Sequence, residues 1–436
     1  MAGERFVVLG LARARSAWFA EVGRWAAGAA IPVEFLRCVS VEELRARLVA
    51  GRAYSCVLLD GGLPAVDRDL LHAARESGAA TLVVDDDRRR RDWVSLGAAA
   101  VLPAVLSREV LLDALATHAA LVDDVAPAPL DAGPGGVGDL GDLGLLASRV
   151  AVVCGPGGTG TSTVAAALAQ GLGDDPAGYG RVVLADLARH AEQAMLHDVR
   201  DVVPGLQELT EAHRGGVPTS AEVEALTFAV VERHYHLLLG LRRARHWATL
   251  RPRAFAAAFD SLRRAFPMLV CDVTADFEGE DDAGSADVEE RNLAARTAAS
   301  LADVVFVVGR PGCKGVHALV RVLADLVGLG VPAPRLVPVV NDAPRHPRVR
   351  AELAATIADL ASPVLGGKAT AGCVFLPTRR VEEALRDAVR LPAPLAPLLA
   401  GAFRAALDHG GQSRVPAGPE PVRVGPGTLG SWAEHS

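Results

Sequence analysis

The stretch between Val150 and Leu172 holds the residues best suited to bind phosphate, because an apolar run, a glycine-rich loop and an alanine-rich helical pattern follow one another. Gly155 and Gly160 occupy the two glycine positions of the phosphate-binding pattern G-x-x-x-x-G-K-(S/T), and Ser162 occupies the hydroxyl position. Backbone N–H groups of such a loop converge on phosphate oxygens, and the following helix adds its positive end. The predicted nucleotide-binding residues of the loop are Gly155, Gly157, Gly158, Thr159, Gly160, Thr161, Ser162 and Thr163.

The lysine of this pattern is missing, since Thr161 stands in its place. That lysine supplies a mobile positive charge to the β- and γ-phosphates during phosphoryl transfer. Lys314 and Lys368 are the only lysines in the chain, and arginine replaces lysine almost everywhere else. Threonine at position 161 is therefore a loss of charge, and we expect hydrolysis to suffer more than binding.

Two other interpretations of the loop stay open. Gly155, Gly157 and Gly160 also fit the dinucleotide pattern G-x-G-x-x-G, in which Asp186 would hold a ribose and the protein would be an oxidoreductase. The loop could also be a tight turn without a ligand, in a protein that acts only through its partners.

Strand-like runs alternate with helical patterns on both sides of the loop, which predicts an α/β protein with parallel sheets. The first 122 residues contain five strand–helix repeats, and Ser40 with Glu43 predicts a capped helix start. From Ser148 onwards seven strands are expected, within 149–155, 180–187, 235–241, 267–273, 302–311, 334–342 and 372–377. The acidic stretch 276–291 is expected to be a surface loop.

Composition sets the domain boundaries. Proline, glycine and aspartate dominate 123–146, which predicts a flexible linker between a domain of residues 1–122 and a domain of residues 147–409, and 410–436 is expected to be a flexible tail. No apolar run is long enough to span a bilayer, and the start does not resemble a signal peptide. The six cysteines form no C-x-x-C pair, so we expect a reduced, cytoplasmic protein.

The second domain resembles the MinD/ParA superfamily of P-loop ATPases, in particular its CpaE/TadZ-type and actinobacterial septum-site-determining (Ssd) branches. The segment GPGGTGTST resembles the deviant Walker A loop K-G-G-x-G-K-(S/T), with Pro156 and Thr161 at the two lysine positions. Asp186 and Ala188 fall on the aspartate pair of the switch I segment, and Asp272 on the Walker B aspartate. Asn341 ends a strand that lies beside the adenine in the family.

The resemblance implies ATP or ADP as ligand, with a weakened Mg²⁺ shell of Ser162, Asp186 and Asp272. Because Pro156, Thr161 and Ala188 replace functional residues, it implies a nucleotide-binding or pseudo-ATPase scaffold with little or no turnover. The implied role is septum-site determination or the positioning of a Tad-type pilus or secretion machine. Protein partners would recruit the chain to the cytoplasmic face of the membrane at a pole or septum, a homodimer is compatible with the family, and the net charge of −7 disfavours direct nucleic-acid binding.

The first domain resembles a response-regulator receiver, with Asp60 at the phosphoacceptor position. The acidic pair that follows the first strand in receivers is absent here, Asp85 lies where a hydroxyl residue is expected, and Leu102 replaces the lysine. The resemblance therefore implies a pseudo-receiver that serves for docking.

Further candidates are interpreted more simply. His234 and His236 are expected on one face of a strand as ordinary histidines, without a metal. Residues 88–91, all arginine, are expected to form a solvated helix start. An active ATPase would need Lys314 or an arginine to replace the lost charge.

Overall fold

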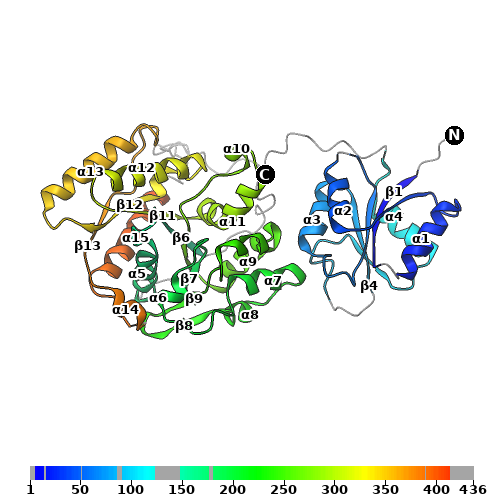
Figure 1. The fold of residues 1–436 in the computed structure, drawn as a ribbon, viewed down its shortest axis with the longest axis horizontal. Coiled ribbons are helices and arrows are strands. Elements are labelled where there is room, and N and C mark those ends of the chain that lie inside the picture. Colours follow the sequence, from blue (N-terminus) through cyan, green and yellow to red (C-terminus); the bar gives the residue numbers. More distant parts are fainter. Residues whose placement is uncertain are drawn as a thin grey trace, which may run out of the picture.

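The computed structural model describes residues 5–13, 16–50, 52–85, 91–122, 148–175, 180–387 and 389–412. It contains one five-stranded and one eight-stranded sheet, which we call the first and second domains (Figure 1). The predicted linker 123–146 lies outside the described residues. Of the predicted tail 410–436, residues 410–412 belong to the last helix, which ends at Gln412, and the rest lies outside the described residues.

The sheet of the first domain has the strand order β2-β1-β3-β4-β5, and its strands run parallel. This 2-1-3-4-5 order is the flavodoxin-like order that response regulators share. Both faces are covered, since Leu9 and Val57 pack on one side and Val8 and Cys56 on the other. The strands are β1 (Phe6–Leu11), β2 (Val33–Cys38), β3 (Cys56–Asp60), β4 (Ala80–Asp85) and β5 (Ala100–Pro103).

Four helices of the first domain are described, α1 (Ala17–Ala27), α2 (Val41–Val49), α3 (Arg68–Glu76) and α4 (Arg108–His118). The predicted start of α2 is confirmed, because the Ser40 hydroxyl accepts the Glu43 N–H. The expected fifth helix is absent from residues 91–99, between β4 and β5. Arg91 donates instead to the Val66 carbonyl and covers the Trp93 ring, so the predicted helix start is wrong at Arg91, and residues 88–90 lie outside the described part.

The sheet of the second domain has the order β13-β12-β11-β6-β10-β7-β9-β8. The seven predicted strands are confirmed, and the sequence missed only β8, a three-residue strand that pairs antiparallel with β9. The strands are β6 (Arg149–Cys154), β7 (Val182–Asp186), β8 (Phe228–Val230), β9 (Tyr235–Leu238), β10 (Met268–Asp272), β11 (Val304–Gly309), β12 (Leu336–Ala343) and β13 (Val374–Pro377).

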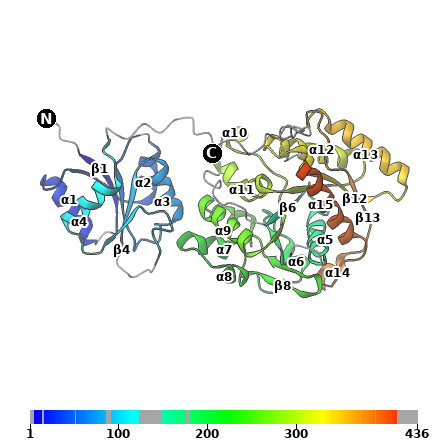
Figure 2. The same cartoon turned by 180° about the vertical axis from the view of Figure 1, so that it is seen from behind.

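Helices cover both faces of this sheet (Figures 1 and 2). On one face α5 (Thr161–Gly173) packs so closely on α15 (Leu395–Gln412) that a Cβ at Gly171 would lie 2.3 Å from the Ala396 carbonyl. The opposite face carries α9 (Pro252–Ala265), α11 (Ala286–Leu301) and α12 (Cys313–Gly328). The remaining helices are α6 (Gln193–Leu196), α7 (Leu206–Gly215), α8 (Ser220–Glu224), α10 (Glu280–Ala283), α13 (Pro347–Ala361), α14 (Glu382–Arg386) and the 3-10 turns η2 (Val231–Arg233), η3 (Ala244–Thr249) and η4 (Ala333–Arg335).

The acidic stretch 276–291 is not a loop throughout, because α10 and the first turns of α11 lie within it. Asp287 and Glu289 stand in the first turn of α11, where the positive end of the helix stabilises carboxylates. The same charges that suggested a solvated loop therefore favour a helix start. None of the helices in the described part of the chain is long and apolar enough to cross a membrane.

The two domains are in contact through α3, which lies against α7 and α9 (Figures 1 and 2). The Asp69 carboxylate accepts the backbone N–H groups of Arg253 and Ala254 at the start of α9, at 3.0 and 3.3 Å. Arg68 donates to the His213 carbonyl near the end of α7 at 3.0 Å. The negative side chain of Asp69 thus lies at the positive end of α9, and the positive side chain of Arg68 lies at the negative end of α7.

A side-chain ion pair reinforces this contact. The Arg214 guanidinium donates to Asp67 Oδ2 through Nε at 3.1 Å and Nη2 at 2.8 Å. The Asp67 side chain also caps α3 by accepting the Leu70 N–H, and it is 3% exposed. One short segment, Asp67–Asp69, therefore provides most of the polar contact between the domains.

Candidate functional site

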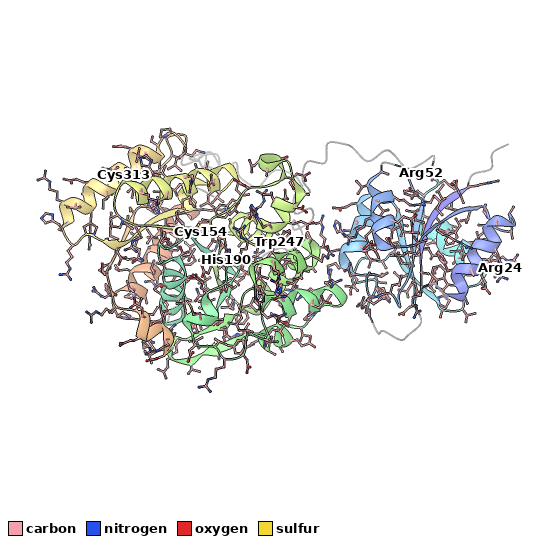
Figure 3. All side chains as sticks on the ribbon, viewed as in Figure 1. Arg24, Arg52, Cys154, His190, Trp247 and Cys313 are labelled. Atoms are coloured by element: carbon pink, nitrogen blue, oxygen red, sulfur yellow. The ribbon has the colours of Figure 1, made fainter. Side chains whose placement is uncertain are left out.

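The glycine-rich loop lies where the direction of strand order reverses. Its strand, β6, runs between β10 and β11, which pair with β6 on opposite sides. Ligands of open α/β sheets bind at the carboxyl ends of the strands at such a reversal. Figure 3 labels Cys154, the last residue of β6, in the interior of the second domain.

The backbone of the loop turns at two glycines. Gly158 and Gly160 have φ angles of 77° and 85°, in the left-handed region that glycine tolerates best. A Cβ added to Gly157 or Gly158 would meet nothing within 4 Å, so the outer side of the loop is open. The loop leads directly into α5, and the first N–H groups of an α-helix have no partner within the helix.

The hydroxyl groups of the loop bond to one another. Thr159 Oγ1 donates to the Pro156 carbonyl at 2.7 Å and lies 3.0 Å from Thr161 Oγ1. Because the Thr159 hydrogen is already used, the Thr161 hydroxyl donates to Thr159. Neither Thr161 nor Pro156 carries a charge that could reach a phosphate.

Asn341, expected beside the adenine, contacts the loop itself. Its Nδ2 donates to the Thr159 carbonyl at 2.9 Å, and a Cβ at Gly160 would lie 2.5 Å from the same nitrogen. The end of β12 is therefore hydrogen-bonded to the loop through Asn341. A side chain at position 160 would displace this contact as well as strain the backbone.

Two buried carboxylates lie beside the loop. Asp186 and Asp272 end the paired strands β7 and β10 in register with each other, and they are 0% and 2% exposed. Burial raises the pKa of Asp272 to about 6, while hydrogen bonds from the side chains of Ser162 and Gln193 act to lower it. Burial and the nearby Asp272 charge raise the pKa of Asp186 well above its ordinary value.

Gln193, which the sequence analysis missed, connects these parts. Its backbone N–H donates to Asp186 Oδ2 at 2.9 Å, and its Nε2 donates to Asp272 Oδ2 at 2.7 Å and to the Ser162 carbonyl at 3.0 Å. The segment after β7 thus folds back onto the loop. A glutamine seven residues beyond Asp186 carries no motif that would have identified it.

The predicted magnesium shell is brought together but does not fit the ion in this arrangement. Mg²⁺ binds oxygen atoms and keeps several of its waters. Here Asp272 accepts hydrogen bonds from Ser162 and Gln193, and Asp186 accepts them from the backbone N–H groups of Ala188 and Gln193. A cation would therefore have to displace these donors or share the carboxylates with them.

Cations do occur near this edge of the sheet, but two of them are engaged. Arg189 Nη1 lies 3.3 Å from Asp276 Oδ2, and Arg310 Nη2 lies 2.7 Å from Asp342 Oδ2. Lys314 is exposed in the first turn of α12 and makes no ion pair with a described residue. It is the lysine that an active ATPase could use in place of the missing one, an arginine being the other possibility.

The sheet order disagrees with the dinucleotide interpretation. In a dinucleotide-binding sheet the strand that follows the glycine-rich helix lies next to the glycine-rich strand. Here β10 lies between β6 and β7. Asp186 is also fully buried and already accepts two N–H groups, so it is not available to a ribose.

Asp60, the predicted phosphoacceptor of the first domain, is buried and hydrogen-bonded. Asp60 ends β3 and is 1% exposed, and its carboxylate accepts hydrogen bonds from Arg13 and from the Gly62 N–H. Asp85 accepts the indole N–H of Trp93 at 3.1 Å. Leu102, at the lysine position, is buried in the core.

Among the described histidines, His234 departs from the prediction. His234 lies outside the strand, with φ of 56°, and its Nδ1 lies 2.9 Å from Asp174, so the expected strand pair with His236 is wrong. No cluster of three or more metal-ligating side chains occurs within the described ranges. The six cysteines are unpaired, and four of them, Cys38, Cys56, Cys154 and Cys271, are buried.

No protein-family model and no curated protein sequence matches the chain. Among solved structures, a ParA family ATPase from Chlorobium tepidum TLS is 14% identical, with a TM-score of 0.41, and the match covers 60% of this chain and 98% of that one. The Pyrococcus furiosus cell division ATPase MinD is 19% identical, with a TM-score of 0.40 and coverage of 61% and 99%. Cyanothece McdA in complex with ATP is 16% identical, with a TM-score of 0.42 and coverage of 61% and 97%.

Proposed function

We propose that the protein is a nucleotide-binding scaffold of the MinD/ParA type that has lost the ability to hydrolyse ATP. The observation that carries the proposal is the contrast within one loop. The backbone of Gly157, Gly158 and Gly160 keeps the open, left-handed path of a phosphate-binding loop, whereas Thr161 turns its hydroxyl back onto Thr159.

Binding without the lysine is physically reasonable. The start of α5 carries a partial charge of about +0.5, and converging N–H groups add hydrogen bonds to an anion. The sheet order excludes a dinucleotide-type crossover, which leaves ATP or ADP as the ligand class that the loop supports best.

Most of the side chains that support ATP hydrolysis in the MinD/ParA family are missing from this chain. Phosphoryl transfer depends on cations placed on the transferred group, worth several orders of magnitude in rate. Pro156 and Thr161 supply none, and Ala188 cannot orient a water molecule. We therefore expect bound nucleotide to change the conformation of the protein without being hydrolysed.

The cellular role follows the ordered set of sequence segments that resemble the CpaE/TadZ and Ssd branches. We propose that the chain helps to determine a septum site or to position a pilus or secretion machine, through protein partners that bring it to a pole or septum. The first domain serves this role as a pseudo-receiver. Its docked position against α7 and α9 supports a structural function for it.

Calorimetric titration of the full chain with ATP and ADP tests the proposal, together with an ATPase assay. We expect micromolar binding without turnover, and loss of binding in Gly160→Arg, because the new side chain meets Asn341 and Gly160 has a φ of 85°. Gly328→Arg is the matched control, since Gly328 is exposed and a Cβ there meets nothing within 4 Å. Turnover comparable to intact ATPases would refute the proposal. If turnover occurs and is abolished by Lys314→Ala, the protein is an active ATPase with a replacement cation.

A further inference from the structure

Gln193 lies at the centre of the site although it belongs to none of the motifs. It is the first residue of α6 and is 0% exposed. Its backbone N–H is fixed on Asp186. Its side chain is therefore held between α5 and the end of β10 from a rigid position.

The orientation of the amide is determined by its partners. Nε2 faces the Asp272 carboxylate at 2.7 Å and the Ser162 carbonyl at 3.0 Å, and both partners are acceptors. Only the –NH₂ end of a glutamine amide can satisfy two acceptors. Oε1 has no hydrogen-bond partner among the described residues, so the side chain acts only as a donor here.

This bridge joins the same two elements that a hydrated cation joins in a P-loop site, the first turn of the loop helix and the aspartate at the end of the neighbouring strand. A cation at this place would bind the Ser162 hydroxyl oxygen and reach Asp272 directly or through its waters. Here the Ser162 side chain and the Gln193 amide both donate to Asp272, and the amide also bonds to the Ser162 carbonyl. A hydrated cation would therefore have to displace donors that already connect these two elements.

We infer that Gln193 replaces the divalent cation, and that this protein binds its nucleotide without Mg²⁺. The inference rests on the proposed nucleotide-binding function and deepens it. A neutral donor bridge supplies the connection between loop and strand at all times, whereas a cation would arrive with each nucleotide. The ligand is therefore the metal-free nucleotide, and the phosphate charge is met by backbone N–H groups and the end of α5.

ATP titration of the wild-type full chain in excess magnesium and in excess EDTA gives the first test. We expect the two dissociation constants to differ by less than about threefold. A dissociation constant at least about tenfold lower with magnesium would overturn the inference and leave the proposed function standing. Absence of binding in both buffers would refute the proposed function, and the inference would then be decided by the metal alone.

The second test therefore measures Mn²⁺ without nucleotide, by the electron paramagnetic resonance signal of the free ion. Gln193→Glu keeps the length of the side chain and replaces the donor by a third carboxylate beside Asp186 and Asp272. We expect it to bind Mn²⁺ at least about tenfold more tightly than the wild type, because carboxylate oxygens are preferred ligands of such ions. Equal binding by both proteins would overturn the inference.

Two further variants keep the test decisive. Gln170→Glu introduces a carboxylate at another buried glutamine, 3% exposed, whose Oε1 accepts the Leu391 N–H, and we expect no gain in Mn²⁺ binding there. If Gln193→Glu does not fold, Gln193→Ala takes its place, because it removes the donor without adding charge. Magnesium should then improve ATP binding of Gln193→Ala by at least about fivefold, and an unchanged affinity would count against the inference.

Discussion

Arg13 encloses the carboxylate of Asp60 from two directions. Its Nε and Nη2 donate to Oδ2 and Oδ1 at 3.0 and 3.1 Å, and its backbone N–H donates to Oδ2 at 3.2 Å. The residue that a receiver would phosphorylate is thereby paired with a permanent internal cation. In the second domain, too, a side chain of the protein bonds to a buried carboxylate, because Gln193 donates to Asp272.

Removal of the Arg13 side chain leaves Asp60 buried with backbone donors only. We expect Arg13→Ala to lower the free energy of unfolding of the first domain by about 1–3 kcal/mol, a range reduced for the partial exposure of the arginine. Urea unfolding followed by tryptophan fluorescence measures the change. Arg24→Ala is the control, since Arg24 is 75% exposed and 3.7 Å from Glu21. Equal effects of the two substitutions would contradict the role of the pair.

Separation of the domains is the expected result of Arg214→Ala. The variant removes both donors to Asp67 and leaves that buried carboxylate with the Leu70 N–H. A lost partner of a buried charge weakens docking by roughly 2–4 kcal/mol. Small-angle X-ray scattering should show a larger radius of gyration than for the wild type. Arg348→Ala, which breaks an exposed pair with Glu352, should leave the radius unchanged.

His197 gives the stability of the second domain a defined pH dependence. Burial lowers its pKa from 6.5 to about 4. The unfolded chain therefore takes up a proton before the native protein does, so stability from the neutral ring is present above pH 6.5 and is lost as the pH falls towards 4. The loss amounts to about 3 kcal/mol at most.

Urea unfolding of the wild type and of His197→Gln over this pH range isolates the effect, because all other groups titrate in both proteins. The wild type should be the more stable at neutral pH, since His197 Nε2 lies 2.7 Å from the Tyr235 hydroxyl. The difference should shrink on acidification. A difference that stays constant with pH would show that His197 does not titrate in this range.

Thr161→Lys restores the missing charge to the loop. We expect ATP affinity to rise about tenfold, with a dependence on salt, since a mobile ammonium reaches the β- and γ-phosphates. Turnover should remain negligible because Pro156 and Ala188 are unchanged. Thr161→Ser keeps the hydroxyl near Thr159 and should bind like the wild type. Appearance of rapid hydrolysis in Thr161→Lys would mean that the lysine alone was missing.

The sequence was sufficient for the described strands other than β8 and for the position of the glycine-rich loop. Buried parallel strands are continuous apolar runs in the sequence, and the spacing of the glycines identifies the loop. It was not sufficient for Gln193 or Arg13. Each acts on an aspartate far from it in sequence, through a loop whose path no local pattern determines.

The errors have local causes. The predicted fifth helix of the first domain failed where Arg91 and Trp93 pack on neighbouring elements instead of continuing a helical turn. The acidic stretch was interpreted by its charge alone, although Asp287 and Glu289 suit the first turn of α11. His234 follows the turn η2 in a left-handed conformation, which a two-residue spacing cannot reveal.

Asp69 completes a helix of the other domain. Arg251, at the start of α9, makes no side-chain cap, and Pro252 has no N–H, so the free donors of Arg253 and Ala254 depend on the carboxylate from α3. From α9 the chain leads straight into β10 and its terminal Asp272. Melting of the first domain therefore uncaps a helix that supports the nucleotide site. The two domains therefore stabilise each other across this contact, and we expect two separately produced halves each to be less stable than in the whole chain.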